Sequence, residues 1–270
     1  MKTYRVKSLE ELFSEGIMQI TLEIATKVRD TVAAGLVKGA GNPVPGQMCV
    51  EAAVCYALGL PHGDDPQCVA RSLRSLKIAV NDAQWSSPQA RAHGLRKLAL
   101  LQLGSAGAMD DRDFARRVAL MTIRTMLPVA LRAVAKKVPT HAQKLAICAN
   151  FCAQVDNIDA TAEAAEAAKA AADATAYGAD ATAYAAYAAK AAAYAADAAK
   201  AVAEAAYAAK AAAYAAKAAA YAADAAADAA EAANTRDKIL TDFCEGVAAI
   251  LIDMQVPGCM WLPLLEEDAG

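Results

Sequence analysis

Residues 183–233 decide the fold, and their sequence is AYAAYAAKAAAYAADAAKAVAEAAYAAKAAAYAAKAAAYAADAAADAAEAA. They belong to a longer tract, residues 160–233, in which 48 of 74 residues are alanine. Alanine loses no side-chain entropy in a helix, so no other residue favours helix as strongly. Because alanine also has almost no side chain to bury, such helices gain from packing only where their backbones approach closely. The tract therefore predicts close-packed helices and says almost nothing about chemistry.

Tyrosines recur in this tract at a spacing of seven residues, which keeps each set within about 20° on a helix. The sets are Tyr177 with Tyr184, Tyr187 with Tyr194, and Tyr207 with Tyr214 and Tyr221. On one continuous helix, about 110 Å long, the third set would lie nearly opposite the other two. We therefore expect two or three helices folded back on one another, with a break near 195–206 or near Gly178. The alternative is a single rod that contacts different neighbours along its length.

Single charges follow the tyrosines by three residues. These charges are Lys190, Asp197, Lys210, Lys217 and Asp224. Alternating signs at helical spacing are typical of a solvated helix face. An ice-binding face would need regularly spaced threonines, and here Thr175 and Thr182 repeat only once. A tyrosine on a rigid helix buries a large area at low entropic cost, so Tyr207, Tyr214 and Tyr221 are our candidate partner contacts.

The large apolar side chains cluster outside the tract, in residues 1–155 and 236–264, with helical periodicity. Their patterns predict helices over 8–39, 47–58, 68–83, 88–103, 110–137 with a bend near Pro128, 139–155 and 236–255. No segment combines the alternation and turn signals of a strand. We therefore expect an all-α helical bundle. Its parts would be a helical domain over 1–159, the alanine-rich tract over 160–233, and a C-terminal helix and tail over 234–270 that packs on the N-terminal domain.

Charge and cysteine content indicate an intracellular protein. The formal net charge is −3, and no basic stripe points to nucleic acid. The N-terminus lacks the apolar core of a signal peptide, and no apolar run has enough large side chains to span a bilayer. The seven scattered cysteines favour reduced, mostly packed thiols in the cytoplasm. A homo-oligomer stays open, because close-packing alanine surfaces can be satisfied within one chain or across a dimer.

Polar residues that packing does not require are concentrated in residues 59–105. Several arginines there could converge on a small anionic or nucleotide-like ligand, aided by the positive helix end at Ser86–Pro88. The candidate ligand-binding residues are His62, Asp64, Asp65, Arg71, Arg74, Asn81, Asp82, Trp85, Ser86, Arg91, His93 and Arg96. Arg71, Arg74 and Lys77 are three residues apart and should share one side of their helix. The alternative is that these residues cap helices and form ion pairs between helices.

The sequence contains no recognised catalytic or phosphate-binding motif. His62 with Asp64 and Asp65 is not an established spacing of metal ligands. Cys148 and Cys152, four apart on one helix face, are more typical of packing than of a metal site. We therefore expect no metal, no cofactor and no catalytic residue. The pattern favours a non-enzymatic protein, and a binder or enzyme for a small anion is the rival.

The repeats YAAKAAAYAAK (207–217) and AYAADAAADAA (220–230) resemble the alanine-rich helical segments of bacterial immunity proteins from polymorphic-toxin systems. The segments CVEAAVCYALGLPHGDDPQCV (49–69), NDAQWSSPQARAHGLRKLALLQLGS (81–105) and ILIDMQVPGCMWL (250–262) are similar to uncharacterised proteins of bacteria and their phages. Neither resemblance carries over a catalytic residue. Together they imply a helical protein that binds a protein partner, in immunity or in phage–host counter-defence. A structural rod or virion component is a third hypothesis.

Overall fold

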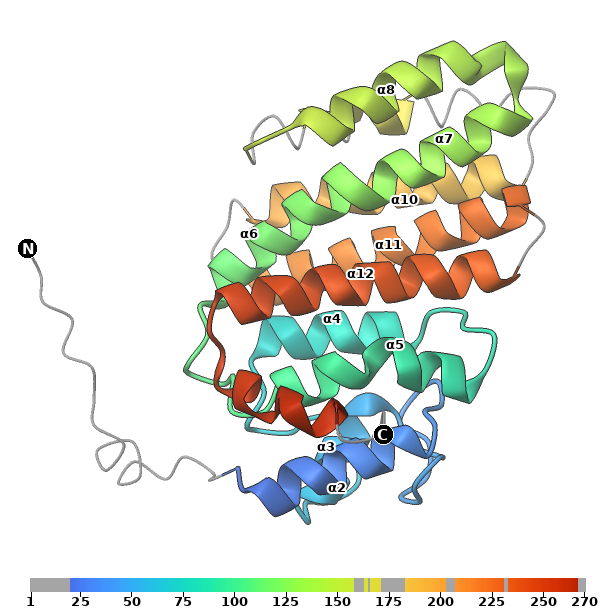
Figure 1. Cartoon of the computed structure of the whole chain (residues 1–270). Coiled ribbons are helices and arrows are strands. Elements are labelled where there is room, and N and C mark those ends of the chain that lie inside the picture. Colours follow the sequence, from blue (N-terminus) through green and yellow to red (C-terminus); the bar gives the residue numbers. More distant parts are fainter. Residues whose placement is uncertain are drawn as a thin grey trace, which may run out of the picture.

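The computed structural model describes residues 20–157, 163–164, 166–170, 183–202, 207–230 and 233–266, and these form a helical bundle (Figure 1). In this part of the chain, extended backbone pairs only at the isolated bridge between Gly41 and Met48. The predicted all-α fold class is confirmed.

The helices follow the order that the apolar periodicity predicts. They are α2 (Leu22–Ala33), α3 (Val50–Ala57), α4 (Arg71–Asn81), α5 (Pro88–Leu101), α6 (Asp111–Met121), the π-helical turn η1 (Thr122–Met126), α7 (Leu127–Lys137), η2 (Pro139–His141), α8 (Ala142–Gln154), α10 (Ala183–Val202), α11 (Ala208–Ala230), α12 (Ala233–Asp253) and η4 (Pro257–Leu265). Side-chain caps set several of the starts, because each satisfies a free N–H group of a first turn. Ser87 accepts a hydrogen bond from Ala90 N ahead of Pro88, and Asp110 accepts from Arg112 N and Asp113 N.

The predicted bend near Pro128 is a π-helical turn in the structure. Proline lacks an N–H group and crowds the preceding turn of a helix. The wider turn η1 comes just before it, and Leu127 N donates to Thr122 O five residues back. Helices α6 and α7 thus continue through Asp111–Lys137, a segment long and apolar enough by composition to cross a membrane. Its most apolar 18-residue window is 56% buried inside the bundle. A helix in the core of a bundle can have the same length and composition.

The alanine-rich tract folds back on itself as an antiparallel hairpin of α10 and α11. The Tyr187 ring stacks on Tyr221 with centroids 6.1 Å apart, and Tyr194 lies 5.7 Å from Tyr214. The two tyrosine sets that would lie on opposite sides of one helix therefore face each other across the hairpin. Helix α10 ends at Val202 and α11 begins at Ala208, and residues 203–206, at the end of the predicted interval, lie outside the described residues. The alternative of a single rod is wrong, and the possible break near Gly178 also lies outside the described residues.

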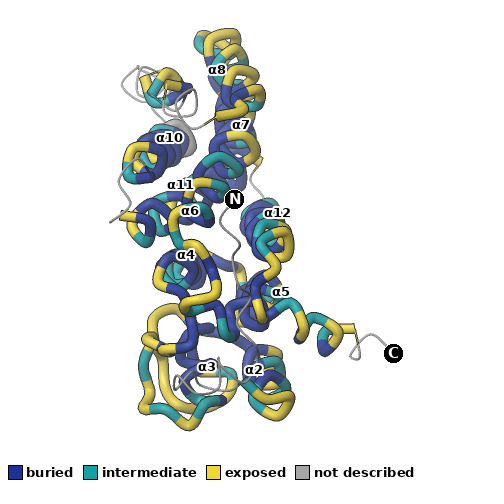
Figure 2. Tube along the Cα trace, turned by 90° about the vertical axis from the view of Figure 1, so that its left-hand side faces the viewer, coloured by how far each residue is buried: buried dark blue, intermediate teal, exposed yellow. Residues whose placement is uncertain are grey.

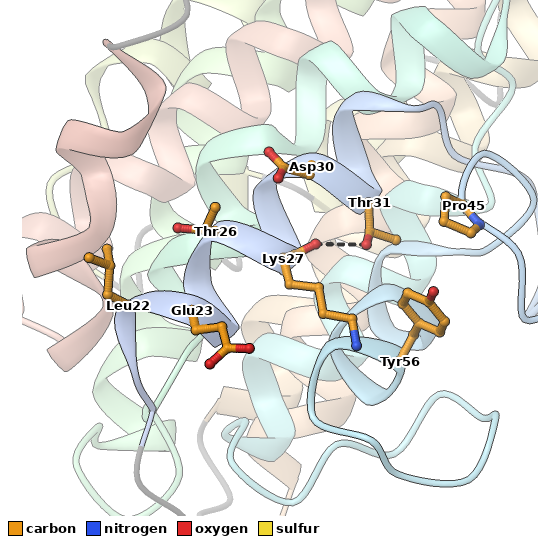
Figure 3. Close-up of a pocket in the computed structure, with 8 residues that line it drawn as sticks. All are labelled: Leu22, Glu23, Thr26, Lys27, Asp30, Thr31, Pro45 and Tyr56. Atoms are coloured by element: carbon orange, nitrogen blue, oxygen red, sulfur yellow. Dashed lines mark hydrogen bonds between the residues drawn. The ribbon is translucent and has the colours of Figure 1, made fainter.

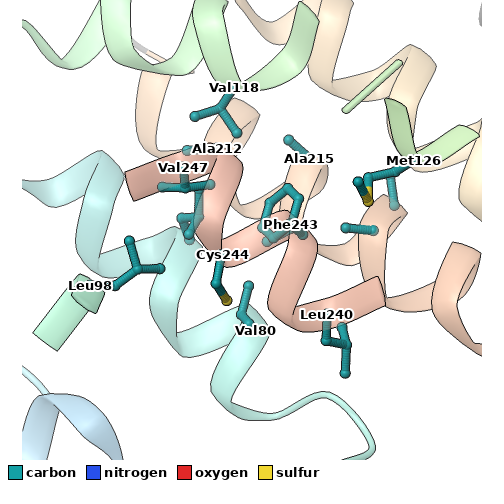
Figure 4. Close-up of a cluster of buried hydrophobic side chains, with 14 of the residues drawn as sticks. Val80, Leu98, Val118, Met126, Ala212, Ala215, Leu240, Phe243, Cys244 and Val247 are labelled. Atoms are coloured by element: carbon teal, nitrogen blue, oxygen red, sulfur yellow. The ribbon is translucent and has the colours of Figure 1, made fainter. Parts of the chain in front are cut away.

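Helix α11 lies in the middle of the bundle, in contact with α4, α6, α7, α10 and α12. Thirteen of its 17 alanines are buried. Figure 4 shows Ala212 and Ala215 among the larger side chains of Phe243, Val118 and Met126 from neighbouring elements. Small side chains on α11 let the main chains approach, and large ones on its neighbours fill the remaining space. The predicted close packing of the tract is thus present in the described helices.

Two perpendicular views give the same arrangement along the bundle, with α8 at one end and α2 and α3 at the other (Figures 1 and 2). Helix α12 packs on α11 and α5, and η4 packs on α5 and α2. Trp261 is buried in that contact. Buried side chains from all three predicted parts of the chain belong to one cluster. The division at 159 and 233 stays a prediction.

Candidate functional site

Two of the candidate ligand-binding residues, Arg91 and Trp85, are buried and hydrogen-bond to backbone carbonyls of the fold. Arg91 is 8% exposed, and its guanidinium donates to Asn81 O at 2.8 Å and to Leu36 O at 2.9 Å. Trp85 is also buried, and its indole N–H donates to Val80 O at 3.0 Å. These bonds satisfy backbone carbonyls at the ends of α4 and of the segment after α2. Neither side chain is available to a ligand in this arrangement.

Other candidates form caps and ion pairs between elements. Arg74 pairs with Asp65, and His62 Nε2 lies 2.9 Å from Gly41 O. Ser86 donates from its backbone N, at 2.9 Å, and from its hydroxyl to the carboxylate of Asp237 on α12. These contacts match the structural alternative that the sequence left open.

The remaining candidates lie in separate places. Asp64, Asn81 and Asp82 line a cavity of about 40 Å³, and His93 and Arg96 line another of about 220 Å³ between α5 and α2. Arg71 is exposed at the start of α4. An anionic ligand held by His62 to Arg96 together stays a prediction.

A buried ion pair beside the small cavity was missed by the sequence reasoning. Lys77 Nζ lies 2.6 Å from Glu51 Oε1, and both side chains are 0% exposed. The three basic residues expected on one side of α4 thus differ in exposure, since Lys77 is buried and Arg71 is exposed. Burial raises the pKa of Glu51 against the effect of Lys77, and burial lowers the pKa of Lys77 against the effect of Glu51. The signal was a lone carboxylate in the apolar run CVEAAVC.

The cysteine thiols have surroundings that oppose nucleophilic chemistry. All seven are free. Burial raises the pKa of Cys55 to about 11 and that of Cys152 to about 12. A catalytic thiol needs the opposite shift, because the thiolate is the nucleophile. Among the described residues, no group of three His, Cys, Asp or Glu side chains could hold a metal ion.

Tyrosine rings and lysine ammonium groups lie in a row along the contact between α10 and α11. Lys190 Nζ lies 5.7 Å from the ring centre of Tyr187 and 5.4 Å from that of Tyr221. Lys217 Nζ lies 5.5 Å from the Tyr194 ring and 5.9 Å from the Tyr214 ring. We call this set the tyrosine–lysine seam; its members are Tyr187, Lys190, Tyr194, Tyr207, Lys210, Tyr214, Lys217 and Tyr221. Each ammonium over two rings gains cation–π attraction without losing its charge.

A cavity of about 770 Å³ lies between this seam and α4 with the turn that follows it. We call it the seam groove. Its lining residues are Lys38, Ser75, Ile78, Ala79, Asp82, Ala83, Gln84, Tyr187, Lys190, Tyr194, Ala213, Lys217, Ala220, Tyr221 and Asp224. A second cavity of about 310 Å³ lies farther along the seam, beside Asp197, Lys200, Tyr207, Lys210 and Tyr214. The groove thus joins the middle of the predicted ligand segment, including the candidate Asp82, to the alanine-rich hairpin.

Another surface cavity, of about 710 Å³, lies against α2 at the far end of the bundle (Figure 3). Lys27 Nζ stands 4.5 Å from the ring centre of Tyr56. Leu22 is 59% exposed at its rim. With one ring and one stacked cation, it offers a partner fewer anchoring groups than the seam does.

The three tyrosines predicted to contact a partner all belong to the seam. Tyr207 is 46% exposed, whereas Tyr214 and Tyr221 are half-buried against other rings. Their contact with a partner stays a prediction. No protein-family model, curated protein or solved structure matches this chain. The function therefore has to be inferred from the seam and its groove.

Proposed function

We propose that this protein is a non-enzymatic, cytoplasmic binding protein that holds a protein partner in the seam groove. The concrete role we propose is immunity or phage–host counter-defence, in which binding alone neutralises the partner. The observation that supports binding is the groove itself, where tyrosines and lysines gather on one rigid hairpin. Tyrosine is enriched among the residues that dominate binding energy in protein interfaces.

The charge of the groove supports a ligand with negative groups. Lys38, Lys190 and Lys217 line it, and in the described part of the chain no carboxylate lies within ion-pair distance of any of them. Complementary charge across an interface speeds encounter and suppresses wrong partners. A partner with an anionic surface would therefore dock in the seam groove, with its negative groups against these lysines.

The rigidity of the frame supports binding without rearrangement. The helix that bears Lys210, Tyr214, Lys217 and Tyr221 is buried among five other helices. The tyrosine rings are stacked before any partner arrives, so little side-chain freedom remains to be lost on binding. A preorganised face of this kind binds more tightly than a mobile one of the same area.

The second candidate function is the binding of a small anionic ligand, because the volume of the groove is typical of small-molecule sites. Sites for small molecules usually have volumes of about 300–1,000 Å³, and the seam groove has about 770 Å³. A thermal-shift series with nucleotides and phosphometabolites separates the two functions. At one hundred times its Kd, a true ligand stabilises the fold by about 2.7 kcal/mol.

The test of the main proposal is capture with a groove variant and a matched control. The bait is the whole chain as wild type, as the double variant Lys190→Glu with Lys217→Glu, and as Lys144→Glu, an exposed lysine on α8. We expect one protein from the host or its phage to be retained by the wild type and the control and lost from the double variant. The pair is then rebuilt from purified components. Retention by the double variant would exclude the seam groove as the binding site.

A further inference from the structure

We infer that the part of the partner held in the seam groove is an acidic α-helix with a carboxylate every seven residues on one face. This inference rests on the proposed function and adds the chemistry of the partner. It follows from the register of the hairpin, from the groups that the seam leaves free, and from the charge of the groove.

The register places the cations of the seam in layers. Tyr187 faces Tyr221 and Tyr194 faces Tyr214, so Lys190 and Lys217 lie at nearly one level between two layers of rings. By the same register, Lys210 lies two helical turns farther along, beside Tyr207 and Tyr214, in the second cavity, which Asp197 also lines. Two turns of an α-helix rise about 11 Å. The two cationic layers, one in the seam groove and one in the second cavity, are therefore separated by the spacing of residues i and i+7 in a partner helix.

Four rings of the seam, those of Tyr187, Tyr194, Tyr214 and Tyr221, already pack against other rings, whereas Tyr207 is 46% exposed. Tyr194 and Tyr221 stack with planes 7° apart and centroids 5.4 Å apart, and ammonium groups cover the same rings. In the seam groove, which Tyr207 does not line, ring edges, hydroxyl groups and ammonium groups remain for a ligand, and the hydroxyl and ammonium groups donate hydrogen bonds. Nucleic-acid bases need free ring faces for stacking. Carboxylates need donors, so the seam favours an acidic protein segment over a single-stranded nucleic acid.

The carboxylates that line the groove are engaged by other groups. Asp224 Oδ1 accepts from Arg236 Nε at 2.7 Å. Asp82 Oδ1 accepts from Gly39 N at 2.8 Å and from Asn81 Nδ2 at 3.2 Å. Arg236 compensates the charge of Asp224, whereas Asp82 accepts only from neutral N–H groups and keeps its negative charge. Three lysines line the groove against this one uncompensated carboxylate, so the lining keeps a positive excess that a partner with negative groups would match.

The apolar lining fits a helix rather than a highly charged extended segment. Ile78 and Ala79 of α4 lie on one wall, and Ala213 and Ala220 of α11 lie on the other. The α11 pair repeats at seven residues, as the lysines do. Apolar side chains one turn from each carboxylate of the partner would pack on these walls, as in other complexes where an amphipathic helix lies in a groove.

The test uses two labelled 21-residue peptides of one composition. The first carries glutamates at positions 4, 11 and 18 of an alanine-based helix, and the second carries them on three different faces. Fluorescence anisotropy measures their binding to the whole chain at low salt. We expect the spaced peptide to bind about tenfold more tightly, a difference that corresponds to 1.4 kcal/mol. Its affinity should fall by at least about tenfold in the double variant Lys190→Glu with Lys217→Glu and stay unchanged in Lys144→Glu.

Three results would overturn the inference. They are equal binding of the two peptides, tighter binding of a single-stranded oligonucleotide than of the spaced peptide, and no loss in the double variant. If the spaced peptide fails while capture of a natural partner still depends on Lys190 and Lys217, the acidic helix is wrong and the proposed function stands. If the spaced peptide binds but capture of a natural partner does not depend on Lys190 and Lys217, the proposed function is wrong.

Discussion

Glu51 and Lys77 have opposite charges and no exposure to water, so each depends on the other. Removing water from two charges costs more than most buried pairs recover, but leaving one of them alone is worse. The pair also lies beside the cavity bordered by Asn81 and Asp82, at the junction of α3 and α4. It fixes how these two helices meet.

We predict that Lys77→Met destabilises the fold by about 3–5 kcal/mol, because Glu51 is left buried and unpaired. Adding Glu51→Met should recover most of that loss, since both charges are then gone. Urea unfolding followed by circular dichroism measures both variants. A double variant as unstable as the single one would show that the two charges are not coupled.

The pairing of Glu51 with Lys77 could not be read from the sequence. The two residues are far apart along the chain, and only the packing of α3 against α4 brings them together. The same applies to Arg91, whose partners are backbone carbonyls of Leu36 and Asn81. Residue types revealed a concentration of polar groups, but the fold decides which of them point inward.

Helix α5 shows how packing can reverse a helix propensity. Gly94 lies inside it, where alanine would normally add about 1 kcal/mol of stability. A Cβ atom at this position would stand 2.2 Å from Cη2 of the buried Trp85. The glycine is therefore required by the indole ring and not by the backbone.

We predict that Gly94→Ala lowers stability by about 1–3 kcal/mol, because the ring has to move out of a packed site. The matched control is Gly246→Ala in α12, where a Cβ would meet only the flexible side chain of Met121, with Sδ at 3.2 Å. Thermal unfolding should give a clearly lower Tm for the first variant than for the second. Equal Tm values would contradict the close approach of Trp85.

Local signals predicted most elements because the caps and breakers act within one turn. Ser87 caps α5, which begins at Pro88, and Asp110 caps α6, which begins at Asp111, close to the helix starts at 88 and 110 that the sequence predicts. The seven-residue tyrosine spacing also foretold a folded-back tract. The spacing could not predict that Lys190 and Lys217 stack on rings of the opposite helix. The register of α10 against α11 is set by contacts across the bundle.

On the scale of the whole molecule, the alanine-rich hairpin is part of the core and not an appendage. Helix α11 touches both the early helices α4 and α6 and the late helix α12. Its alanines allow these contacts because they keep the helices close. The bundle is therefore sensitive to side-chain size at the centre of α11.

We predict that Ala215→Leu, at a position with 0% exposure, destabilises the fold by about 1–3 kcal/mol through overpacking. The control is Ala186→Leu on α10, where the alanine is exposed and leucine should change little. Both helices keep a good helix former, so propensity does not confound the comparison. Chemical unfolding measures the difference, and equal stabilities would place α11 at the surface.

The most direct test of the central claim is the distance between residues 190 and 217. Spin labels are attached to a ketone-bearing amino acid at each position, which leaves the cysteines untouched, and pulsed electron spin resonance gives the separation. Neighbouring helices lie about 8–10 Å apart, so the hairpin predicts a label distance below about 20 Å. A continuous helix would place the two residues about 40 Å apart. That longer distance would contradict the seam, the groove and the function proposed for them.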